Sequence, residues 1–115
     1  MGNVVQLHRP ASVQNPTVAV GTGTSSVVTL EGFAMGMVML PSTYDSTAIT
    51  FTVCDTYGGT YVPYCGTDGN AVSITCAASK AFALPEGLFG AKFIKIVGGS
   101  NEGGAGSTLT VQLKA

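Results

Sequence analysis

Histidine, the side chain that most often acts as a general base, occurs once in this chain of 115 residues. His8 stands beside Arg9 and Pro10 in an N-terminal stretch without helical periodicity. A general base must be held in place by its neighbours, and an extended segment holds it poorly. The sequence therefore predicts an ordinary solvent-exposed histidine here and no Ser–His–Asp triad.

The acidic residues do not form a recognisable catalytic pair. Asp45 and Asp55 flank one expected strand and lie roughly 25–30 Å apart at ~3.3 Å per residue, too far for a glycosidase. The turn 66–70 lacks the EF-hand pattern, and the Gly-rich stretch 98–107 lacks the lysine and helix of a phosphate-binding loop. We expect 98–107 to be a flexible loop. All acids fall at expected turns or strand ends, where they are usually solvated: Glu31, Asp45, Asp55, Asp68, Glu86 and Glu102. The sequence predicts no catalytic residue, no metal and no cofactor, and hence no enzyme.

Three cysteines, Cys54, Cys65 and Cys76, cannot all pair within one chain, and no C-x-x-C motif is present. They are expected to be small buried apolar residues in a reducing cytoplasm. A Cys54–Cys65 disulfide is the alternative.

Tyrosines gather around two expected loops. Tyr57, Tyr61 and Tyr64 could form a platform on which a sugar ring stacks, or they could pack at a subunit interface. The sequence leaves both interpretations open, although the absence of Trp weakens the first.

The composition predicts an assembling protein. Charged residues make up 10% of the chain, against about 25% on average, while hydrophobic residues make up 45%. A monomer of this mass would expose about 5,800 Å² with few charges on it, so we expect other subunits to cover part of the surface. The alternative is a monomer kept in solution by its many Ser, Thr, Gly and Asn. The net charge of −1 and the lack of a basic patch argue against nucleic acid.

Neither a secretory signal nor an apolar run of the ~20 residues that a membrane helix needs is visible, so no membrane partner is expected. Residues 1–16 read as an extended N-terminal arm and residues 17–115 as one β-sandwich domain. Short strands are expected at 17–20, 26–31, 33–40, 47–54, 60–65, 71–76, 80–84, 92–97 and 108–115, with one helical turn opened by Pro85. This number of strands predicts an all-β, jelly-roll-like sandwich.

The stretch 33–40 is apolar on both faces of the expected strand. Phe33 and the three methionines Met35, Met37 and Met39 share one face, and residues such as Val38 share the other. One face is expected to pack on the core and the other to meet another subunit. The residues expected in the core are Phe33, Met35, Met37, Phe51, Phe89 and Phe93.

Parts of residues 33–96 resemble a group of small virion proteins of tailed phages and prophages. The resemblance is carried by "FAMGMVMLP", by "AITFTVCDTYGGTYVPY", and most specifically by "ALPEGLFGAKFIKIVGGS". It implies a β-sandwich on the capsid surface that acts as a decoration or cement protein, made in the host bacterial cytoplasm. A sugar-binding or adaptor module of a phage tail or fibre is the alternative.

The implied partners are other copies of the chain, in an expected trimer, and the major capsid protein. The residues expected to make these contacts are His8, Arg9, Met35, Met37 and Met39.

Overall fold

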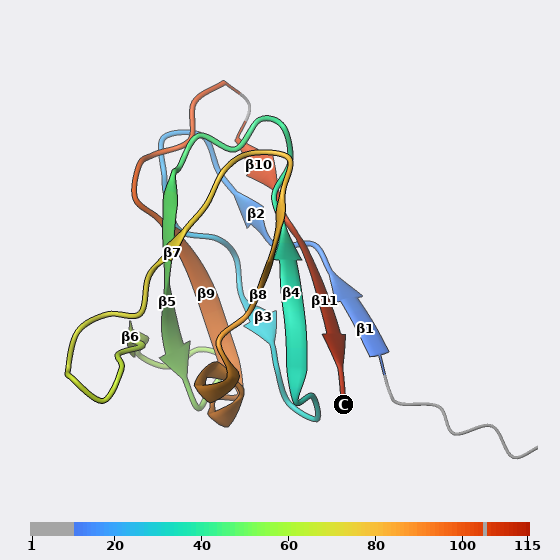
Figure 1. Cartoon of the computed structure of the whole chain (residues 1–115), viewed down its shortest axis with the longest axis vertical. Coiled ribbons are helices and arrows are strands. Elements are labelled where there is room, and N and C mark those ends of the chain that lie inside the picture. The colour runs from blue at the N-terminus through green and yellow to red at the C-terminus, as the bar shows by residue number, and fades with distance from the viewer. Residues whose placement is uncertain (1–10, 105) are drawn as a thin grey trace, which may run out of the picture.

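Alternating apolar residues build two antiparallel sheets whose inner faces share one core. The structure is a computed structural model that describes residues 11–104 and 106–115. The first sheet has the order β1 (Ala11–Gln14), β11 (Thr110–Lys114), β4 (Met35–Met39), β8 (Ala81–Ala83). The second has the order β3 (Val28–Thr29), β9 (Phe93–Gly98), β5 (Ala48–Cys54), β6 (Val62–Pro63), and β7 (Ile74–Thr75) also pairs with β5. Figure 1 shows β4, β11 and β1 side by side.

The strand order is that of a jelly roll. With β1, β3, β4, β5, β7, β8, β9 and β11 taken in chain order, the first sheet joins the first, eighth, third and sixth strands. The second sheet joins the second, seventh, fourth and fifth. Two facing sheets interleaved in this way define the jelly-roll sandwich. The fold class expected from the sequence is therefore confirmed.

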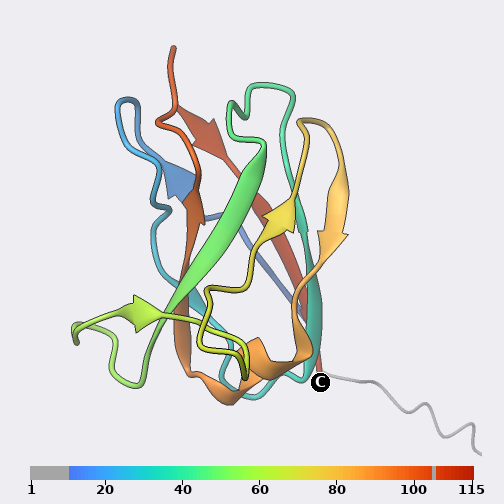
Figure 2. The same ribbon diagram turned by 60° about the vertical axis from the view of Figure 1, so that its left-hand side comes forward.

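Two small additions complete the described fold. A short ladder pairs β2 (Thr17–Val18) with β10 (Ser107–Thr108). A 3-10 helix, η1 (Glu86–Gly90), follows Pro85, as the sequence predicts. Strand β6 lies at the edge of its sheet, which suits Pro63, because proline has no N–H to donate to a further strand. Figure 2 shows the segment that carries β6 standing out from the body.

The expected N-terminal arm is in part a strand of the sandwich. Residues 11–14 form β1, which pairs with β11 from Ala11↔Lys114 to Gln14↔Val111. Just beyond β1, the Leu109 N–H donates to the Pro16 carbonyl at 2.8 Å. Because prolines precede and follow β1 and its residues do not alternate clearly, local sequence does not reveal it. The boundary expected at 16/17 is therefore corrected: residues 11–16 belong to the sandwich, and residues 1–10 lie outside the described residues.

The core is built from the inward positions of both sheets. Phe51 and Ile49 of β5 and Ile94 and Ile96 of β9 are almost fully buried, as their alternation predicts. From the first sheet they meet Val38, Val111 and Leu113. Gly36 of β4 is required by close packing, because a Cβ there would lie 2.6 Å from the Leu113 side chain and 2.7 Å from the Gln112 carbonyl oxygen. Gly36 thus allows β4 and β11 to approach closely.

Candidate functional site

The outer face of the first sheet is largely apolar, except along β11, whose outward residues Thr110, Gln112 and Lys114 are polar. Paired residues of an antiparallel sheet share a face, so the register defines its rows. The middle row runs Val13–Gln112–Met37–Ala83, and Ala11–Lys114–Met35 and Thr110–Met39–Ala81 lie on either side of it. We call these residues together the methionine face. Lys114 is its one charged residue.

The methionines of this face lie in solvent rather than in the core. Met35, Met37 and Met39 are 48, 42 and 41% exposed, and Val13 is 61% exposed. Placing Met35 and Met37 in the core was therefore wrong. The period of two correctly separates the two faces of β4, but both faces are apolar, and it is Val38 that points inward at 0% exposure.

The other residues expected in the core divide into three groups. Phe51 is fully buried. Phe33 and Phe89 are partly buried against the core. Phe93 is half-buried and alternates with Ile94, so it lies on the outer face of the second sheet.

A groove crosses one end of the methionine face. Its volume is about 740 Å³, and it extends from Gln112 and Lys114 of β11 to Glu86 and Phe89 of η1. Methionine side chains are flexible and polarisable, so they adapt to the shape of whatever covers them. The floor of this groove is apolar, and its two sides carry opposite charges, Lys114 on the β11 side and Glu86 on the η1 side. This arrangement is suited to binding a protein surface.

A second surface, the aromatic cluster, consists of Tyr57, Tyr61, Phe93 and Lys95. The ring of Tyr57 meets that of Phe93 edge to face, with centroids 5.8 Å apart. Lys95 places its Nζ 4.5 Å from the centre of the Tyr61 ring, a cation–π contact. The Tyr61 hydroxyl donates to the Tyr57 carbonyl at 3.2 Å, which ties the loop to itself. Partial burial, with smaller effects of Cys54 and Tyr57, raises the pKa of Tyr61.

Only part of the predicted tyrosine platform exists. Tyr57 and Tyr61 lie together, but Tyr64 packs partly against the core, close to η1, where a Cβ at position 87 would overlap its hydroxyl. Phe93 and Lys95, which complete the cluster, were missed. Their signal was present in the alternation of β9, which puts both on the outer face, but nothing local indicates that the loop reaches them.

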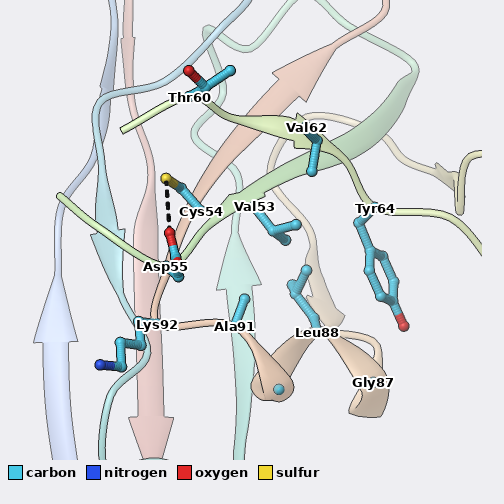
Figure 3. A pocket seen from close by; sticks show the side chains of 11 residues that line it. Val53, Cys54, Asp55, Thr60, Val62, Tyr64, Gly87, Leu88, Ala91 and Lys92 are labelled. Carbon is cyan, nitrogen blue, oxygen red and sulfur yellow. Dashed lines mark hydrogen bonds between the residues drawn. The ribbon is translucent and has the colours of Figure 1, made fainter. Parts of the chain in front are cut away.

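Tyr64 lines a cavity of about 530 Å³ between the end of β5, β6 and η1 (Figure 3). Its polar groups do not converge. The Cys54 thiol lies 4.0 Å from the Asp55 carboxylate, and Lys92 and Tyr64 stand at opposite sides of the view in Figure 3. Most of the lining is apolar, including Val53, so the cavity offers a small apolar indentation.

The Gly-rich segment was expected to be flexible, but its described residues, 98–104 and 106–107, are held by a buried carboxyl group. Glu102 is 2% exposed; its Oε2 accepts from the Asp45 N–H at 2.9 Å and its Oε1 from the Ser107 hydroxyl at 2.5 Å. In return, the Asp45 carboxylate accepts from the Gly103 N–H at 2.7 Å. Glu102 is therefore a structural anchor rather than a solvated acid. Its partner Asp45 is 57 residues away in the sequence, which is why the sequence did not reveal this anchor.

The cysteines are free in the structure, so the alternative disulfide is not formed. Cys54 and Cys76 are buried as expected, whereas Cys65 is exposed. Burial raises the pKa of the Cys76 thiol. Asp68 caps its own turn by accepting from the Asn70 N–H at 3.0 Å, and this bond lowers the pKa of Asp68.

The remaining predictions concern residues outside the described part of the chain, or kinds of site that the sequence did not predict. His8 and Arg9 lie outside the described residues. Within residues 11–104 and 106–115, no three His, Cys, Asp or Glu side chains gather as a metal site would require. In the same residues, no helix has the length and apolar character needed to cross a membrane.

No protein-family model matches the chain, and no curated protein matches its sequence. The molecule belongs structurally among jelly-roll sandwiches. A solved structure with the same fold is the crystal structure of SPBc2 prophage-derived protein YomS. It matches with a TM-score of 0.65 over 98% of this chain and 100% of that chain, at 15% sequence identity. The likeness therefore spans the whole jelly roll, strand β1 included.

Proposed function

We propose that the protein is a non-enzymatic structural protein of a phage virion, and specifically a capsid decoration or cement protein. The methionine face is the observation that carries this proposal. It presents a largely apolar sheet surface that is crossed by the polar outward residues of β11, with Lys114 as its one charge. Burial of its apolar part against a shell would stabilise the shell by about 25 cal/mol per Å² before entropic costs.

Two further observations support a phage origin. The fold is shared with a prophage-derived protein, and the block from Ala83 to Ser100 resembles small virion proteins. In this proposal the chain is made in the cytoplasm of the bacterial host and binds copies of itself and the major capsid protein on the capsid surface. The proposed assembly is a trimer, because a capsid position with three-fold symmetry would bind three copies of the chain.

Immuno-electron microscopy of particles from a strain with a tagged copy of the gene tests this location. Label over the shell, together with loss of the protein from particles when Met37 is replaced by Lys, would support the proposal. Label on the tail or fibre would favour the adaptor alternative. Particles that carry no label would reject both.

The aromatic cluster favours one second candidate, a carbohydrate-binding module. Tyr57 is 69% exposed, and its edge contact with Phe93 holds the ring in place, as a sugar-stacking side chain requires. Lys95 would select acidic sugars. Calorimetric titration with neutral and acidic oligosaccharides tests this. Binding that is lost in Tyr57→Ala but kept in Tyr64→Phe would support the module, and absence of binding to every glycan would end it.

A further inference from the structure

We infer that the methionine face binds the same face of a second copy of this chain, in a two-fold pair with the first sheets stacked face to face. The expected axis runs parallel to the strands, between β4 and β8. This pairing goes beyond the proposed function and is expected of the free protein. It uses the face that the proposed function assigns to the shell, so the second copy and the shell would compete for it.

The shape of the face is self-complementary about this axis. The methionines of β4 form a ridge, and the adjacent strand β8 carries only the small residues Ala81 and Ala83 on the same face. Rotation by 180° about a line between the two strands lays each ridge over the alanine strand of the other copy. Stacked sheets lie about 10 Å apart, and a large side chain opposite a small one fills that space.

The charges select the same axis. Lys114 and Glu86 line the groove from opposite sides, Lys114 from β11 and Glu86 from η1, at the end of the sheet where Met35 lies. Rotation about an axis parallel to the strands exchanges the two sides but keeps this end. Lys114 of each copy then faces Glu86 of the other, which gives two equivalent ion pairs.

A two-fold axis that lies in the plane of the sheet but perpendicular to the strands would instead exchange the two ends of the face. It would bring Lys114 over the other end of the face, where the described residues are Thr110, Met39 and Ala81. The ammonium group would then lose water without gaining a partner, which is costly. Charge complementarity therefore favours the parallel axis.

The size of the face sets the expected strength. The four strands lie about 4.8 Å apart, and the longest of them, β4 and β11, have five residues at about 3.4 Å each, so the whole face covers at most roughly 14 by 17 Å. The proposed axis stacks β4 and β8 directly on each other and buries less than this. This area is smaller than the ~800 Å² per partner of a standard interface, even when the surface of the side chains that project from the sheet is included. The pair is therefore expected to be reversible, with a dissociation constant in the micromolar range or above.

Sedimentation equilibrium of the full chain from about 10 μM to 1 mM tests the pairing, with charge-swap variants to test its geometry. Lys114→Glu and Glu86→Lys each turn two attractive contacts into repulsive ones, and each should weaken dimerisation about three- to tenfold. The double variant should recover it. Lys92→Glu makes the same change of charge at an exposed site near η1, away from the methionine face, and should have no effect.

Circular dichroism of every variant checks that it is folded. If a single variant is poorly folded, the double variant still tests the pairing, because it should dimerise as the parent does. A concentration-dependent dimer, weakened by each single swap and restored by both together, supports the pair. A monomer throughout the range overturns it. So does a trimer that is indifferent to the swaps, or a dimer that the double variant does not restore.

Discussion

The side chain of Gln14 hydrogen-bonds both backbone groups of Thr29. Its Nε2 donates to the Thr29 carbonyl at 2.8 Å, and its Oε1 accepts from the Thr29 N–H at 2.9 Å. Gln14 ends β1 at the edge of the first sheet, and Thr29 lies on β3 at the edge of the second. One amide side chain thus takes the place of a neighbouring strand and joins the two sheets along an open side of the sandwich.

Replacing Gln14 with Glu should destabilise the fold by about 1–3 kcal/mol, because a carboxylate cannot donate to the Thr29 carbonyl and repels it. Urea denaturation measures the change. Gln112→Glu, the same substitution at an exposed position of β11, is the matched control and should alter stability little when measured at low protein concentration. Equal effects of the two substitutions would show that the bridge contributes nothing.

Truncation at two positions should separate attachment from folding. Deletion of residues 1–10 keeps every described strand, so it should leave the melting temperature unchanged. In the proposed function, this deletion and replacement of Arg9 should weaken attachment to the capsid. Deletion of residues 1–16 also removes β1, its ladder with β11 and the Gln14 bridge, and should lower the melting temperature strongly. Full capsid binding by the shorter deletion would contradict the role of the arm.

The reciprocal contacts of Asp45 and Glu102 predict how the Gly-rich loop opens. Glu102→Ala removes the acceptor of the Asp45 N–H and of the buried Ser107 hydroxyl, and should cost about 2–4 kcal/mol. Glu102→Gln keeps one acceptor oxygen, and its amide can donate to the Ser107 hydroxyl, so it should cost less. Hydrogen exchange of the Asp45 and Gly103 amides reports the opening directly. Glu31→Ala, at an exposed acid, is the control and should leave both amides protected.

The features that were predicted correctly from the sequence are those that depend on the local pattern of residues. The strict alternation of β5 placed Ile49 and Phe51 inside, and Pro63 marked an edge strand; the structure confirms both. Alternation cannot choose between two apolar faces, which is why Met35 was misplaced. Glu102 was misjudged for another reason: its burial depends on Asp45, a partner that is 57 residues away in the sequence.

The same limit applies to the candidate surfaces. Each methionine was predicted to be a contact residue from its own strand, but the face exists because β11 and β8 flank β4. The groove residues Lys114 and Glu86 come from segments far apart in the chain, so their opposition across Met35 is a property of the jelly-roll order. No window of sequence contains it.

Tyr44 predicts how stability changes in alkali. It is 5% exposed, and burial raises its pKa from 10.0 to about 12, an effect that the nearby Ser46 hydroxyl partly offsets. No group among the described residues meets hydrogen-bond geometry with the Tyr44 hydroxyl, because the Ser46 hydroxyl bonds the backbone of Ser100 instead. The unfolded chain ionises this phenol near pH 10, whereas the folded chain keeps it neutral. Its contribution to stability is therefore complete below pH 10 and is lost as the pH rises towards 12.

Tyr44→Phe should remove this alkaline loss, because phenylalanine has no proton to release. It should also keep or slightly raise stability at pH 7, since the hydroxyl it removes is buried without a partner. Urea denaturation at pH 7, 10 and 11 measures both effects. Tyr57→Phe alters an exposed tyrosine and should retain the alkaline loss. A Tyr44→Phe protein that loses stability above pH 10 as steeply as the parent would show that Tyr44 is not the group responsible.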